Sequence, residues 1–190
     1  MPPAEPAAVP PSLGEGTSEQ RWAAVRAAAD RKDAVALLAA ALEREIDPAV
    51  REAIFTGLTR IGTRESAAAL LPFLRSNDAG LRTGALDALR AMPEAARAHL
   101  PSLLADPDAD VRLLSCELAR GLPEDEANRL LCALLEREGD KNVCGAALEV
   151  LAEIGQAQAL PGIRRCAERF GDDPFIAFSI KVATERIAGP

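Results

Sequence analysis

A repeat of about 31 residues runs through most of this chain. Five segments begin with aspartate and carry an aliphatic anchor residue three positions later: 47–62, 78–93, 108–123, 140–155 and 173–189. The anchors Val50, Leu81, Val111, Val143 and Ile176 are 31, 30, 32 and 33 residues apart. Such a fixed period is typical of repeat architectures, in which each repeat buries its apolar face against its neighbours.

Each segment has the periodicity of a helix with one broad buried face. Apolar or small residues fall at offsets 0, 3, 4, 7, 8 and 11 from the anchor, as in Val50, Ala53, Ile54, Gly57, Leu58 and Ile61. A second apolar segment precedes each of them, at 33–45, 65–76, 96–106, 126–138 and 158–170. The sequence therefore predicts helical hairpins, and a half-repeat at 17–30 adds one N-terminal helix.

Composition favours helices over sheets. Aromatic residues make up 3% of the chain and tyrosine is absent, so Ala and Leu must form the core, whereas strands favour β-branched and aromatic residues. The fold class predicted is all-α. Residues 1–16 hold five Pro in their first eleven positions and are expected to form a flexible Pro-rich tail, or a docking peptide, before one domain at 17–190.

Two polar columns accompany the repeat. The recurrent aspartate stands before each helix, where its carboxylate can accept the free N–H groups of the first turn. An arginine follows the anchor in the first three repeats, and the half-repeat has Arg21 in the same place. We expect an Asp–Arg ladder between neighbouring hairpins, formed by Asp47, Arg51, Asp78, Arg82, Asp108 and Arg112. The arginine is missing at Cys144 and Ala177.

The stretch 106–117, DPDADVRLLSCE, has nearly the spacing of an EF-hand calcium loop. That loop needs glycine at its sixth position, which here is Val111, the buried anchor of the repeat. Of the three aspartates, Asp108 recurs in every repeat and is interpreted as the helix cap. Asp106 and Asp110 are interpreted as local additions, so no calcium site is predicted.

Charge and side-chain inventory argue against several classes of function. The net charge of −7 disfavours binding to nucleic acid or anionic membranes. The four cysteines form no CxxC pair, His99 is the single histidine, and no phosphate-binding glycine loop is present. We therefore expect reduced thiols, a cytoplasmic location, and no catalytic residue, metal or cofactor.

The D-x-x-V-R template, following helices that carry LLPFL or HLPSLL, resembles HEAT repeats, most closely the short bacterial variety named after phycobilisome lyases. The resemblance covers residues 17–189. It implies a right-handed α-solenoid of about five HEAT-like hairpins plus one N-terminal helix. It also implies that the second helix of each hairpin lines the concave side, where such proteins bind other proteins.

Charged residues recur on the expected concave side. Asp87, Glu117 and Glu149 lie six residues after their anchors, and Arg90 and Arg120 lie nine after. We interpret these five as a partner-binding surface; a solvated, mutually paired face is the alternative. The function expected is a non-catalytic scaffold or adaptor that binds another protein and is itself a monomer or weak dimer. A lyase or chaperone acting on a cofactor-bearing protein remains the other possibility.

Overall fold

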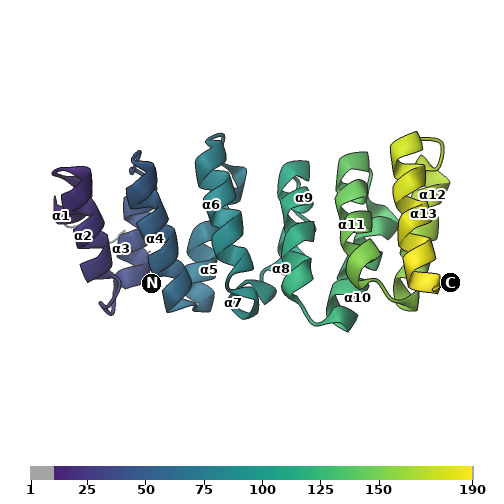
Figure 1. Cartoon of the computed structure of the whole chain (residues 1–190), viewed down its shortest axis with the longest axis horizontal. Helices are drawn as coiled ribbons and strands as arrows, with labels where there is room; N and C mark the ends of the chain where they lie inside the picture. The colour runs from purple at the N-terminus through teal and green to yellow at the C-terminus, as the bar shows by residue number, and fades with distance from the viewer. Residues whose placement is uncertain (1–10, 190) are drawn as a thin grey trace, which may run out of the picture. The chain divides into compact units, whose positions relative to one another are not determined.

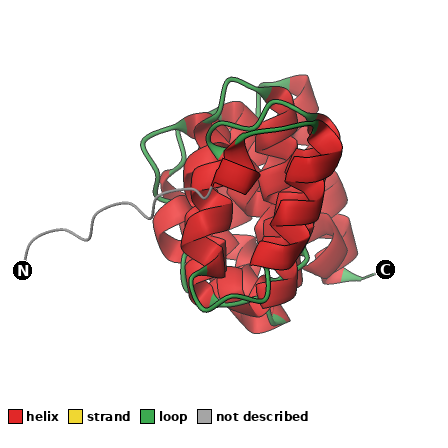
Figure 2. Ribbon diagram, turned by 90° about the vertical axis from the view of Figure 1, so that its left-hand side faces the viewer, coloured by secondary structure: helices red, strands yellow, loops and turns green. Residues whose placement is uncertain are grey.

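The computed structural model describes residues 11–189, and every regular element in that range is an α-helix or a short 3-10 helix (Figures 1 and 2). The prediction of an all-α fold is confirmed. Most of the expected Pro-rich tail, residues 1–10, lies outside the described residues. Within the rest of it, Pro11–Gly14 form the one-turn helix α1, which packs on α2 and buries Leu13. Helical structure thus begins before the boundary expected at residue 17.

The second helices occupy the half-repeat and the five repeated segments. They are α2 (Ser18–Ala28, from the half-repeat), α4 (Pro48–Ile61), α6 (Ala79–Arg90), α9 (Ala109–Leu118), α11 (Lys141–Ile154) and α13 (Pro174–Ala188). The anchors Val50, Val111, Val143 and Ile176 are at most 1% exposed, and Leu81 is half-buried. The helical period read from the sequence therefore identifies most of the core positions.

Each of these helices begins at a capping side chain. Asp47 Oδ1 accepts the N–H groups of Ala49 and Val50 at 2.9 and 3.3 Å, and Asp78, Asp108, Asp140 and Asp173 cap their helices in the same way. At α2, Thr17 and Gln20 form a capping box. The caps fix where each second helix starts and so keep the repeats in register.

The first helices are less regular. They are α3 (Ala34–Leu42), α5 (Arg64–Leu70) continued by η1 (Leu71–Arg75), α7 (Pro93–Arg97) with α8 (Leu100–Leu103), α10 (Glu124–Arg137), and η3 (Ala157–Ala159) continued by α12 (Leu160–Phe170). A further 3-10 turn, η2 (Ala119–Gly121), follows α9. Pro72, Pro101 and Pro161 lie in first turns, where a missing N–H costs no helical hydrogen bond.

The helices group into two compact units that divide within α7, between Ala96 and Arg97. In the N-terminal unit, α2, α4 and α6 pack in sequence as one layer, and α3 and α5 form a second layer beside them. In the C-terminal unit, α9, α11 and α13 form one layer, and α10 and α12 form the other. Both units therefore have the two-layer packing expected of stacked helical hairpins.

Candidate functional site

The repeated arginines tie each second helix to the loop before it. Arg51 Nε donates to the carbonyl oxygen of Glu45 at 2.7 Å, six residues earlier. Arg82 and Arg112 make the equivalent bonds to the carbonyls of Ser76 and Asp106 at 2.6 and 2.7 Å. Each guanidinium thus donates to the loop of its own hairpin, and its other N–H groups can donate to the next hairpin.

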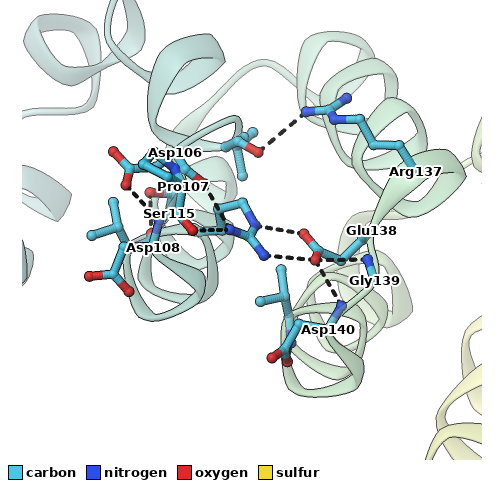
Figure 3. A network of polar contacts seen from close by, with 12 residues as sticks. Asp106, Pro107, Asp108, Ser115, Arg137, Glu138, Gly139 and Asp140 are labelled. Atoms are coloured by element: carbon cyan, nitrogen blue, oxygen red, sulfur yellow. Dashed lines mark hydrogen bonds and ion pairs between the residues drawn. The ribbon is translucent and has the colours of Figure 1, made fainter.

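Two of the arginines bond to a residue of the next hairpin other than the aspartate that the ladder predicts. Arg51 reaches the capping Asp78 at 2.8 Å, as the ladder model expects. Arg112, however, forms two parallel hydrogen bonds to Glu138, at 2.8 and 2.9 Å (Figure 3), and Arg21 pairs with Glu45 at the same distances.

Both glutamates lie two residues before the capping aspartate. There the carboxylate can meet the planar guanidinium with two hydrogen bonds. Where this position is Ser76, the cap itself receives the arginine.

The same position also builds the turn. One oxygen of Glu138 accepts the N–H groups of Gly139 and Asp140 (Figure 3). One oxygen of Glu45 accepts the N–H groups of Ile46 and Asp47 in the same way. Asp106 occupies the equivalent place and accepts the N–H of Asp108 at 3.0 Å. The interpretation of Asp106 as a local addition is therefore wrong.

Sequence reasoning missed Glu45 and Glu138, although an acidic residue five positions before the anchor recurs in three of the five repeats. The hydrogen bond from Arg21 holds the pKa of Glu45 below its usual range despite burial. Burial alone would raise the pKa of Glu138, but the hydrogen bonds from Arg112 and from the Asp140 N–H outweigh burial and lower it. These groups are hydrogen-bonded and nearly buried, so their role is structural.

On the second helices of the C-terminal unit, three of the predicted partner-binding residues come together. Arg120 Nε lies 3.0 Å from Glu117 and its Nη2 lies 3.9 Å from Glu149 on the next second helix. Arg120 also forms an ion pair with Glu153, which sequence reasoning did not select. Three carboxylates therefore share one guanidinium, and this surface is locally acidic.

The other two predicted residues, Asp87 and Arg90, belong to the N-terminal unit. Their charged groups are 4.0 Å apart, one turn apart on α6, and both side chains are about half exposed or more. An exposed pair of this kind contributes at most about 1 kcal/mol to folding. It is available to a ligand but forms no further cluster that the structure describes.

A groove runs between α11 and α13, next to the acidic cluster. Its lining includes Glu149 and Glu153 from α11 and Phe175, Phe178 and Val182 from α13. The groove has a volume of about 340 Å³. Phe175 and Phe178 are 67% and 66% exposed, which is unusual for aromatic rings.

The N-terminal unit has a corresponding groove between α2 and α4. Trp22 lies in it at 40% exposure, with the Arg26 guanidinium 4.8 Å from the ring centroid. Trp22 and Phe178 occupy the same place in the repeat, two residues after Gln20 and after the anchor Ile176. That offset is not among the buried ones, and this is the signal in the sequence that favours exposure of both aromatic residues.

The cysteines offer little reactivity. Cys116, Cys144 and Cys166 are buried and Cys132 is half-buried. Burial raises the pKa of the Cys116 thiol to about 12, so the nucleophilic thiolate is not formed at neutral pH. Over residues 11–189, no three His, Cys, Asp or Glu side chains are grouped to hold a metal ion. Nor does any described helix have the length and apolar character needed to cross a bilayer.

Stacked two-layer hairpins, capped and joined by arginine–carboxylate pairs, define a helical-repeat protein with grooves between its second helices. The model of HEAT repeats matches residues 13–90 and 97–174, and the chain belongs to the HEAT-repeat family. No curated protein matches the sequence.

Similarity to one solved structure supports the fold. A structure described as the structural basis of microtubule plus-end tracking by XMAP215, CLIP-170 and EB1 is similar over 92% of this chain and 88% of that one, with 14% identity and a TM-score of 0.56. The CpcE–CpcF complex of phycocyanin lyase from Nostoc sp. PCC7120 aligns over 98% and 96%, with 16% identity and a TM-score of 0.39. A designed armadillo repeat protein aligns over 93% and 97%, with 14% identity and a TM-score of 0.42. The first similarity shows the helical-repeat fold alone, and the other two carry no argument.

Proposed function

We propose that this HEAT-repeat chain is a non-catalytic scaffold that binds another protein through the exposed side of its second helices. The observation that carries the proposal is the α11–α13 groove, where Phe175 and Phe178 are exposed beside Glu149 and Glu153. Aromatic residues are enriched at the centres of protein interfaces, and burying such rings is the main source of binding energy there.

The location of exposed apolar side chains favours the second helices over the first. Among the described residues, the exposed large hydrophobic side chains are Trp22, Ile46, Phe175 and Phe178, and all except Ile46 line a groove between second helices. The groove along the first helix α10, bounded by Arg97 and by Gln158 of η3, is lined mainly by charged and polar side chains, such as those of Asp125, Arg129 and Glu136. A protein partner would gain more apolar burial on the second helices.

The charged residues Glu117, Arg120 and Glu149 belong to this proposal as residues that select and orient the partner. Asp87 and Arg90 are proposed separately, as partner-binding residues of the N-terminal unit. Complementary charge at the rim of an interface governs specificity and association rate more than affinity. The lyase alternative receives no support from the α11–α13 groove, whose lining contains neither His nor Cys.

Affinity capture from cells of the source organism tests the proposal. The bait proteins are the wild type, the groove variant Phe175→Ser/Phe178→Ser, and the control Ile46→Ser, which removes an apolar side chain that is 80% exposed outside both grooves. We expect one protein to be retained by the wild type and the control, and lost by the groove variant. Equal retention by all three folded baits would refute binding through this groove.

A further inference from the structure

We infer that the α11–α13 groove binds an amphipathic helix whose polar side carries lysine or arginine. This inference rests on the proposed function and specifies the class of its partner. It is carried by two observations on the same groove: an apolar stripe along α13 and an acidic edge along α11.

The apolar stripe has helical spacing. Phe175, Phe178 and Val182 follow one another at i, i+3 and i+7, so they lie along one side of α13 over about two turns, or about 10 Å. The small residue Gly145 faces them from α11: a Cβ there would lie 3.2 Å from Cε1 of Phe175. The two rings and the valine thus form one wall of a groove long enough for the apolar side of a short helix.

The acidic edge lies opposite. Glu149 and Glu153 are one turn apart on α11, with side chains 72% and 50% exposed. Arg120, which pairs with both glutamates, is also paired with Glu117. One positive charge therefore faces three carboxylates. Arg186 is the cation in the groove lining, and it also donates to the Ala152 carbonyl. Together with Arg120, it leaves the three carboxylates and two cations at a net charge of −1. A cationic helix complements this edge.

The shape of the groove favours a helix as the occupant. It lies between two helices packed side by side (Figure 1), and ridges of a third helix fit such a groove, as in other helix-in-groove complexes. The described residues contain no strand, so they offer no sheet edge to an extended peptide.

A second copy of this chain is a poorer occupant. The whole chain is acidic, with a net charge of −7, so a second copy would bring more negative charge to an edge that is already negative. Stacking of another hairpin on α13 is also disfavoured. Where α11 buries Leu148 and Leu151, α13 has Lys181 and Thr184. Lys181 is exposed and pairs with Glu185 at 3.9 Å, and burying such a charged pair is costly.

Fluorescence polarisation with the full chain tests this inference. The probe is a fluorescein-labelled 18-residue peptide with leucine along one helical side and lysine elsewhere. Two matched peptides are the same sequence with glutamate for lysine and a scrambled Leu/Lys sequence without a helical stripe. The protein variants are Phe175→Ser/Phe178→Ser and Glu149→Gln/Glu153→Gln. Their controls outside the groove are Ile46→Ser and Glu136→Gln.

We expect the Leu/Lys helix to bind the wild type more tightly than either matched peptide. Its Kd should rise about tenfold or more in the phenylalanine variant and about two- to tenfold in the glutamine variant, with both controls unchanged. The inference is overturned if groove and control variants bind alike, or if the scrambled or glutamate peptide binds as well as the Leu/Lys helix.

Failure of this inference is distinguishable from failure of the proposed function. If the phenylalanine variant loses the captured partner but the peptides bind all variants alike, the class of partner is wrong and protein binding through the groove stands. If neither the captured partner nor the peptide responds to the groove variants, both proposals fail.

Discussion

Arg112 joins two hairpins through a single guanidinium. It donates to the Asp106 carbonyl in its own loop and to both carboxylate oxygens of Glu138 in the next one. The Glu138 side chain is only 3% exposed. When a buried carboxylate loses its cation, its desolvation is no longer compensated. Removing Arg112 is therefore expected to lower the free energy of unfolding far more than removing a partner from an exposed ion pair.

Replacing Arg112 measures that cost. We expect Arg112→Ala to lower the free energy of unfolding by about 3 kcal/mol, because Glu138 is left buried without its partner. Arg31→Ala is the matched control: Arg31 pairs with Asp33 at the same 2.8 Å, but both side chains are about half exposed, so the loss in the free energy of unfolding should be much smaller. Urea denaturation of both variants gives the two values. Equal losses would show that burial of the pair contributes nothing.

The pKa values of the buried glutamates predict how stability changes with pH. Glu45 and Glu138 have lower pKa values in the folded state than in the unfolded chain, where glutamate titrates near about 4.3. The unfolded state then binds more protons, so their stabilisation is present above about pH 4.3 and is lost as pH falls through the folded pKa.

Thermal unfolding between pH 6 and pH 3 checks this. The variant Glu45→Gln/Glu138→Gln should have a lower Tm than the wild type at pH 6. Its Tm should also fall less than that of the wild type between pH 6 and pH 3. Parallel Tm curves for the two proteins would be incompatible with the assigned pKa shifts.

At the scale of residues, the sequence was sufficient to predict the caps but not the ladder partners. A cap acts within its own helix start, so the pattern of aspartate before an apolar period identifies Asp47 and its equivalents. The partner of Arg112 depends on which side chain the adjacent hairpin brings within reach. That position holds Glu, Ser, Asp, Glu and Gly in successive repeats. It is acidic in three of the five, but the residue type alone does not show which arginine it meets.

At the scale of elements, the close packing of α4 against α6 depends on one glycine. A Cβ at Gly84 on α6 would clash with the ring of Phe55, which projects from α4 and is 6% exposed. Glycine inside a helix costs about 1 kcal/mol relative to alanine, so its presence here is explained by the ring beside it.

A double-mutant cycle tests this contact. We expect Gly84→Ala to destabilise the protein by about 1–2 kcal/mol, the cost of overpacking less the gain in helix propensity. In a Phe55→Leu background the same change should cost much less or become stabilising, because the clashing ring atoms are gone. Free energies of unfolding for the four proteins provide the measurement, and a coupling energy near zero would contradict the assigned contact.

The helices themselves were largely predictable. Periodicity and caps identify the second helices, whereas the first helices of the second and third hairpins are interrupted, at η1 and between α7 and α8. Pro72 and Pro101 in these segments signal interruptions. The division into two units within α7 has no marker in the repeat pattern.

For the whole molecule, charge and apolar exposure together define the proposed binding face. The charged residues Glu117, Arg120 and Glu149 were predicted from their offsets, but Phe175 and Phe178 were not selected as site residues. A phenylalanine in an apolar helix usually packs in the core. Phe175 and Phe178 are exposed, and they lie at offsets −1 and +2 from the anchor, outside the offsets that the repeat buries. The offset alone does not distinguish a surface aromatic residue from a core one, because Phe55 at offset +5 also lies outside that set and is only 6% exposed.

Partner binding should therefore depend on salt. Screening of the acidic edge is expected to raise the Kd for the captured partner severalfold between 50 and 300 mM NaCl. The Glu149→Gln/Glu153→Gln variant should show a shallower dependence, since it has lost the charges being screened. Titration of the purified partner at four salt concentrations measures both slopes. Identical slopes would show that these carboxylates do not face the partner.

The most direct test of the binding face is the affinity of the purified partner for three forms of the full chain, measured by isothermal titration calorimetry. We expect Phe175→Ser/Phe178→Ser to raise the Kd at least about tenfold and Ile46→Ser to leave it within about twofold of the wild type. A groove variant that is folded and binds its partner as tightly as the wild type would contradict the central claim that this protein acts through the groove between α11 and α13.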